Sequence, residues 1–129
     1  MLGIWACDNY IQDFYVYCRF YHQSFNNMIL CGDLNSNKRW DKKNKSRNHM
    51  ATIDLLEKIG LHSCYHYITG ETQGEETVPT FYMYRNINIP YHIDYSFAPK
   101  QTISDFTIGS ASEWLAHSDH MPIVLDISV

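Results

Sequence analysis

The stretch Ile29-Leu30-Cys31-Gly32-Asp33-Leu34-Asn35-Ser36-Asn37 decides how this chain is interpreted. An apolar run that suits a buried strand ends at a glycine, and a carboxylate and an amide follow it, two positions apart. Turn chemistry alone favours Asp and Asn at such a place. A strand end is also a rigid mount for functional groups, and Asp33 and Asn35 carry oxygens that suit a hard cation or a reacting water. The stretch therefore predicts a strand that presents chemistry at the rim of a sheet.

Two further segments place ligand-type side chains at predicted strand ends. His92 and Asp94 lie in "YHIDYSF", and Asp119 and His120 lie in "SDHMP". A protonated histidine can stabilise charge on a phosphoryl oxygen, and a carboxylate that is bonded to it fixes its tautomer. Each residue alone has an ordinary structural explanation as a turn, a cap or half of an ion pair. Taken together, the three segments suit hydrolysis of a phosphate ester by an activated water.

The charge distribution indicates a candidate substrate-facing segment. The net charge of −4 argues mildly against a general nucleic-acid binder, but six of the ten Lys and Arg residues fall within residues 38–47. A phosphate attracted to this basic segment would lie beside the candidate ligands, whereas the simpler interpretation is a solvated loop. The candidate substrate contacts are Asn37, Lys38, Arg39, Trp40 and His92.

The composition indicates one globular domain, because the chain has 129 residues of which 45% are hydrophobic. No stretch approaches the roughly 20 apolar residues of a membrane span, and no N-terminal segment resembles a secretion signal. The four cysteines form no CxxC pair. Free thiols in the reducing cytoplasm are therefore expected, without a membrane partner.

Hydrophobic periodicity predicts an α+β fold: one mixed, largely antiparallel sheet of about six strands with two helices on one face. The expected helices cover residues 10–25 and 47–59. The expected strands cover residues 2–5, 28–31, 80–84, 91–97, 103–108 and 121–127. Polar loops are expected at 32–46, 68–78 and 109–118.

The motifs "GDLN", "PTFY", "HIDY" and "SDHMP", in this order, resemble the C-terminal half of the endonuclease/exonuclease/phosphatase superfamily, which is DNase I-like. The resemblance implies that residues 1–129 form a single C-terminal half-domain, half of the family's four-layer α/β sandwich. It also implies a phosphoester hydrolase that uses Mg2+ or Mn2+, on substrates that range from nucleic acid and nucleotides to inositol phosphates and lipid head groups. The basic segment favours a nuclease-like phosphodiesterase.

The resemblance also implies roles for five residues. Asp33 would orient and activate the attacking water, and Asn35 would help to position the water and the phosphate. Asp119 would be a carboxylate of the metal site. His120 would contact the scissile phosphate, with Asp94 as its carboxylate partner.

The asparagine and the metal-binding glutamate of the family's N-terminal half have no counterpart in this sequence, which therefore resembles half of an active site. An inner sheet face left without its usual cover predicts a homodimer or other self-association through that face. The alternative hypothesis is a catalytically inactive half-domain that acts as an assembly or binding module. A zinc site of His62, His66, His117 and Asp119 is a minor alternative.

Overall fold

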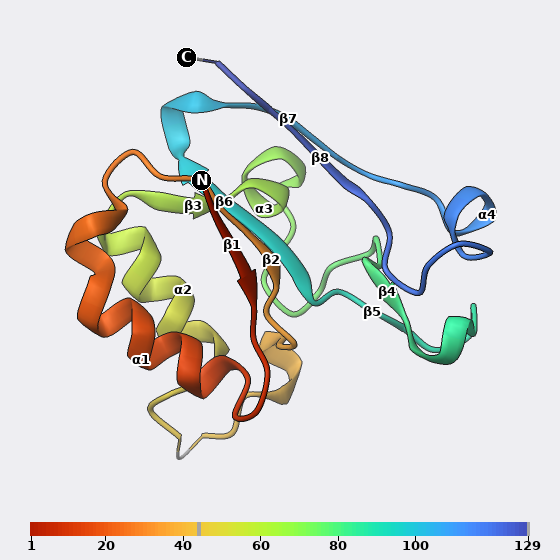
Figure 1. Cartoon of the computed structure of the whole chain (residues 1–129), viewed down its shortest axis with the longest axis horizontal. Helices are drawn as coiled ribbons and strands as arrows, with labels where there is room; N and C mark the ends of the chain where they lie inside the picture. The colour runs from red at the N-terminus through yellow and green to blue at the C-terminus, as the bar shows by residue number, and fades with distance from the viewer. Residues whose placement is uncertain (44, 129) are drawn as a thin grey trace.

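A computed structural model describes residues 1–43 and 45–128 of the chain and has the expected α+β class (Figure 1). The helices are α1 (Ile11–Tyr21), α2 (His49–Lys58), α3 (Cys64–Thr69) and α4 (Ala111–Trp114), with 3-10 turns η1 (His22–Phe25), η2 (Lys38–Trp40), η3 (Met83–Arg85) and η4 (Lys100–Thr102). The strands are β1 (Leu2–Trp5), β2 (Leu30–Asp33), β3 (Leu61–Ser63), β4 (Phe81–Tyr82), β5 (Pro90–Tyr91), β6 (Asp94–Pro99), β7 (Ile103–Ile108) and β8 (Ile123–Ile127). None of the helices in these described residues is long and apolar enough to cross a membrane.

The strands divide into three sheets, which corrects the expectation of one sheet of about six strands. The main sheet has four strands in the order β1-β2-β6-β3, with β1 parallel to β2 and β6 antiparallel to both of its neighbours. The pairs β4–β5 and β7–β8 are separate two-stranded sheets. The expected strand over 91–97 is interrupted because the backbone N–H groups of Ile93 and Asp94 donate to the Thr80 hydroxyl. The chain therefore leaves one ladder after Tyr91 and enters another at Asp94.

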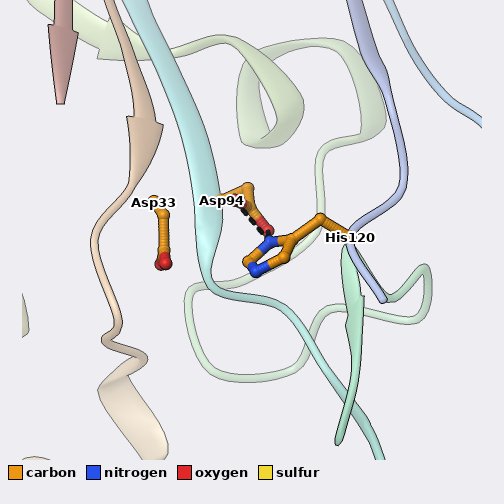
Figure 2. A group of neighbouring side chains, drawn as sticks. All are labelled: Asp33, Asp94 and His120. Carbon is orange, nitrogen blue, oxygen red and sulfur yellow. Dashed lines mark hydrogen bonds and ion pairs between the residues drawn. The ribbon is translucent and has the colours of Figure 1, made fainter. Parts of the chain in front are cut away.

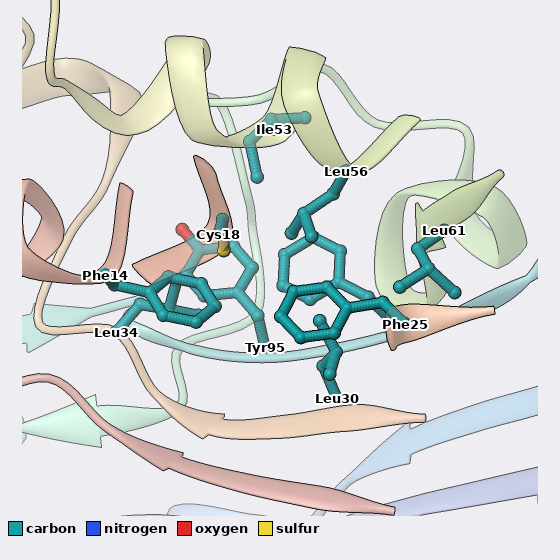
Figure 3. Close-up of a cluster of buried hydrophobic side chains, with 10 residues drawn as sticks. Phe14, Cys18, Phe25, Leu30, Leu34, Ile53, Leu56, Leu61 and Tyr95 are labelled. Atoms are coloured by element: carbon teal, nitrogen blue, oxygen red, sulfur yellow. The ribbon is translucent and has the colours of Figure 1, made fainter. Parts of the chain in front are cut away.

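The main core lies between one face of the four-stranded sheet and helices α1 and α2 (Figures 1 and 3). Tyr95 and Phe97 alternate inward from β6 and are fully buried. Phe14 and Cys18, four positions apart on α1, share the helix face that meets them. The expected pair of helices on one face of the sheet is thereby confirmed.

The opposite face of the sheet is covered in part by α3 and the β7–β8 hairpin. A second cluster joins Tyr65 of α3, Ala98 of β6 and Phe106 of β7. Beside it, a cleft of about 400 Å³ separates the sheet from the hairpin and has apolar walls that include Ile29 and Leu125. We call it the inner-face cleft; Asp94 lies in its lining.

Candidate functional site

Asp33 and Asp94 stand opposite each other where β2 and β6 pair. The two residues are direct partners across the antiparallel ladder, and Trp5 of β1 pairs with Asp33 on its other side. Directly opposed carboxylates repel each other across a sheet. The fold therefore places two like charges side by side at one end of its central strands, as Figure 2 shows.

Asn35 fixes the orientation of the Asp33 carboxylate. The Asn35 backbone N–H donates to Asp33 Oδ1 at 2.7 Å, and its side-chain Nδ2 donates to Asp33 Oδ2 at 3.0 Å. The same Nδ2 donates to the carbonyl of Ala6 at 2.9 Å, which ties the arrangement to the end of β1. Asn35 adopts a left-handed φ of +46° that Asn tolerates better than most residues. Both parts of the "D-x-N" motif are thus used to hold one carboxylate still.

His120 approaches the two carboxylates from the loop before β8. Its Nδ1 lies 3.0 Å from Asp94 Oδ2 and 3.1 Å from Asp94 Oδ1, and its ring lies against Phe81 with the centroids 4.6 Å apart. The His120 side chain is 36% exposed and that of Asp94 13%, so the histidine edge of the pair is open to solvent. With Nδ1–H donating to Asp94, the remaining ring nitrogen of His120 is available to a ligand.

The three side chains form a candidate cation site. Asp33, Asp94 and His120 each offer one ligand atom, and these atoms all lie within 4.8 Å of one another. Burial raises the pKa of Asp33, as does the nearby charge of Asp94, while the Asn35 N–H and His120 act in the opposite direction. A divalent cation would offset the burial and repulsion of these carboxylates, and the oxygen-rich donor set suits Mg2+ or Mn2+.

Thr80, which the sequence reveals only through "PTFY", joins the strands that carry the site. Its hydroxyl accepts hydrogen bonds from the N–H groups of Ile93 and Asp94, both at 3.0 Å. Its carbonyl accepts from Met121 N at 2.7 Å, so Thr80 links β6 to the segment that follows His120. The residue is fully buried. Thr80 therefore positions Asp94 and His120 relative to each other.

Replacement of Thr80 by valine is expected to destabilise the protein by about 2–4 kcal/mol, because two buried N–H donors lose their acceptor. The expected loss appears as a lower midpoint of urea unfolding. Thr80→Ser keeps the hydroxyl and should retain most of the stability. Thr80→Val keeps the γ-methyl and removes only the hydroxyl, so a loss no larger than that of Thr80→Ser would contradict the positioning role of the hydroxyl.

The remaining predicted site residues lie in different surroundings. Asn37 and His92 are buried: Asn37 Nδ2 donates to Glu76 Oε2 at 2.9 Å, and His92 Nδ1 donates to the carbonyl of Val78 at 2.8 Å. The structure therefore does not present Asn37 or His92 to a substrate. Asp119 is partly exposed, and its carbonyl accepts from Tyr82 N at 2.8 Å. Its carboxylate is not part of the cation cluster, so its role as a metal ligand stays a prediction.

Asn37 belongs to a buried polar network that the sequence did not indicate. His66 Nε2 lies 3.0 Å from Glu76 Oε1, and the Glu76 side chain is 0% exposed. Burial acts to raise the pKa of Glu76, but hydrogen bonds from His66, Asn37 and the Gly74 N–H outweigh it and hold the pKa well below its usual range. The network therefore fixes the loop that follows α3 against the segment that follows "GDLN".

The same network bears on the zinc alternative. His66 lies in α3 and is bonded to Glu76, Ser63 and Gln73, whereas His62 lies in β3. Among the described residues, the cluster at Asp33 is the one group of three or more side chains close enough to share a metal ion. The proposed zinc ligands are not brought together.

The architecture of this chain belongs to a known class of fold. No family model and no curated protein matches the chain. The fold is a DNase I-like one, as found in solved endonuclease domains. One matching structure is the endonuclease domain of TRAS1, a telomere-specific non-LTR retrotransposon, with a TM-score of 0.57 and 22% sequence identity. The match covers 91% of this chain and 49% of the solved domain, so the chain spans about half of its length. At this identity the likeness shows the fold alone.

Proposed function

We propose that this chain carries the C-terminal half of a metal-dependent, nuclease-like phosphodiesterase. The observation that carries the proposal is the cluster of Asp33, Asp94 and His120, in which an oriented carboxylate faces a carboxylate–histidine pair. Phosphoester hydrolysis requires a group that orients a water and a group that meets the phosphoryl charge, and the cluster supplies both. The endonuclease fold of the TRAS1 domain supports nucleic acid as the substrate class.

The proposed reaction divides the chemistry among the side chains of the cluster and Asp119. Asp33, held by Asn35, orients the attacking water and accepts its proton. In its protonated form His120 donates its second ring N–H to the phosphoryl oxygens, while Asp94 accepts from Nδ1 and keeps the ring in the orientation that allows this. Mg2+ or Mn2+ bound by the Asp33 and Asp94 carboxylates, with Asp119 as a further predicted ligand, would supply Lewis-acid stabilisation of the developing charge.

We infer that a second protein surface completes the site. The inner-face cleft exposes apolar walls and reaches Asp94, and the chain spans 49% of the solved endonuclease domain. A second copy that packs face to face on this cleft would bury the apolar surface beside the candidate ligands. The alternative, an inactive half-domain that serves as an assembly module, would use the same apolar cleft without hydrolysis. The four free cysteines are compatible with the expected cytoplasmic location.

The experiment that tests the function is hydrolysis of bis(4-nitrophenyl) phosphate and of a labelled oligonucleotide with Mg2+ or Mn2+. His120→Ala should reduce the rate about 10²–10³-fold, because a preorganised donor to the phosphoryl group is lost. His117→Ala, which removes an exposed histidine three positions away, is the matched control. Sedimentation of the same samples reports whether activity accompanies self-association. Equal rates in the wild type, both variants and a metal-free blank would favour the inactive module.

A further inference from the structure

A second cleft opens beside the candidate site, between the start of α1 and the part of the basic segment that follows Arg39. It has a volume of about 240 Å³. We call it the basic cleft and define it by the six lining residues that matter here: Tyr10, Asn35, Trp40, Lys42, Lys45 and Arg47. None of these is a member of the cation cluster, so the cleft is a separate feature of the surface.

Three cations of the basic cleft are free to meet an anion. Lys42, Lys45 and Arg47 are exposed, and none forms an ion pair with another residue of the described chain. The acidic side chain in the wall is Asp41, whose carboxylate accepts the His49 and Met50 N–H groups at 2.8 and 2.9 Å. Because these bonds occupy Asp41 at the start of α2, the cleft offers a net positive site for phosphate.

The basic cleft is continuous with the candidate site along two routes. Asn35 lines the cleft and also holds Asp33. Trp40 lies against Tyr91, with ring centroids 5.5 Å apart, and Phe81 stands between Tyr91 at 6.4 Å and His120 at 4.6 Å. A strand whose phosphodiester reaches His120 would therefore place a neighbouring nucleotide at the cleft.

We propose that the basic cleft binds the nucleotide next to the scissile phosphodiester, in an unpaired stretch of nucleic acid. Lys42, Lys45 and Arg47 hold its backbone phosphate, and the base stacks on Trp40, which is 47% exposed. An aromatic ring that stacks on a base face needs that base to be out of a duplex. This inference rests on the proposed function and names its substrate as single-stranded nucleic acid.

The assignment changes which basic residues are expected to contact substrate. Lys38 and Arg39 precede the cleft but do not line it. The Lys38 side chain instead lies beside Gly74, where an added Cβ would be 3.2 Å from Lys38 Cβ. Lys42, Lys45 and Arg47 therefore replace Lys38 and Arg39 as the proposed phosphate contacts.

The test is fluorescence anisotropy with a labelled single-stranded oligonucleotide in EDTA, where binding is measured without cleavage. Replacing Lys42, Lys45 and Arg47 together by alanine should weaken binding at least tenfold. The slope of log K against log salt should become less negative by roughly 0.7, since the cleft neutralises one backbone phosphate of a single strand. Trp40→Ala should weaken binding of the single strand about tenfold and leave binding of a duplex of the same sequence unchanged.

A matched control removes three cations that do not line the basic cleft. It combines Arg19→Ala, Lys58→Ala and Lys100→Ala, which are all exposed. The control should bind the oligonucleotide nearly as well as the wild type. Equal losses in the control and the cleft variant would overturn the proposal, as would wild-type affinity for polyglutamate or for duplex equal to that for the single strand.

The design separates this inference from the proposed function. Binding in EDTA does not depend on catalysis, and hydrolysis of bis(4-nitrophenyl) phosphate by the wild type does not depend on binding a neighbouring nucleotide. Oligonucleotide binding at the basic cleft without any hydrolysis would support the cleft and reject the enzyme. Hydrolysis of bis(4-nitrophenyl) phosphate without cleft-dependent oligonucleotide binding would support the proposed enzyme and reject the nucleotide site at the basic cleft.

Discussion

Replacement of Gly32 by alanine is expected to destabilise the protein by about 3 kcal/mol or more, a large part of the roughly 5–15 kcal/mol that holds a domain together. Gly32 has a φ of +145°, and a Cβ at this position would lie 1.9 Å from the carbonyl oxygen of Ile4. The obstructing atom belongs to the backbone of β1, so no side-chain rotation relieves the contact. The pairing of β1 with β2 must therefore give way.

The same change should disturb the site, because β1 supports it. Ala6 N donates to the Asp33 carbonyl at 2.8 Å, and Ala6 O accepts from Asn35 Nδ2. Urea unfolding followed by far-UV circular dichroism measures the loss of stability. Gly3→Ala is the matched control in the same strand pair, since no atom lies within 4 Å of the added Cβ. Similar unfolding midpoints for the two variants would show that β1 can shift at little cost.

The periodic parts of the sequence predicted the main architecture. Alternation over 91–97 placed Tyr95 and Phe97 inward, and both are fully buried. Apolar residues spaced three and four positions apart over 10–25 predicted a helix. This helix is α1, and it packs on one face of the sheet. These features follow from local patterns. The side chains of a strand alternate between its two faces, and those on one face of a helix recur every three or four residues, so nearby positions reveal which face is apolar.

The features that the sequence did not predict depend on contacts between distant segments. Thr80 resembles an ordinary strand residue until its hydroxyl is seen to hold Asp94, fourteen positions away. His66, which lies outside the expected helices and strands, forms a buried pair with Glu76 of the expected polar loop 68–78. Such partners leave no periodic signal.

The candidate site shows the same division. The motifs indicated Asp33, Asp94 and His120, and the fold brings all three together. Proximity to a motif was a poorer guide for Asn37 and His92, because it does not fix the direction of a side chain. Both turn inward, where the break between β5 and β6 and the loop that follows α3 provide their hydrogen-bond partners.

Replacement of Asp33 by asparagine is expected to reduce phosphodiester hydrolysis about 10²–10⁴-fold, the usual range for loss of a positioned acid or base. The same change should alter how stability depends on pH. Burial and the charge of Asp94 raise the pKa of Asp33 above its ordinary value of 3.8. A carboxyl with a raised pKa in the folded state stabilises the protein while protonated, and this stability is lost as the pH rises through the folded value.

The wild type should therefore lose stability relative to Asp33→Asn as the pH rises above about 4, because the half-buried carboxylate ionises less readily in the folded protein than in the unfolded chain. Thermal unfolding of both proteins across this range measures the difference. The side-chain amide of the variant has a single oxygen and cannot accept both hydrogen bonds that Asn35 donates to the Asp33 carboxylate. A constant difference in stability between the two proteins is therefore expected from the lost hydrogen bond. The test is whether this difference changes with pH. Asp126→Asn, on the exposed surface of β8, should follow the wild type.

Mg2+ or Mn2+ should reverse the difference at neutral pH. A cation that binds the folded wild type stabilises it in proportion to the logarithm of the metal concentration, and Asp33→Asn should gain little. If the stabilities of the wild type and Asp33→Asn differ by a constant amount at every pH and metal concentration, the folded protein stabilises the Asp33 charge without a cation. A difference that grows with pH and disappears with metal would mean that the fold retains a charge that it disfavours. The negative charge of Asp33 does not stabilise the pairing of β2 with β6, because it faces the Asp94 carboxylate. Its presence would then be explained by the cation that it binds.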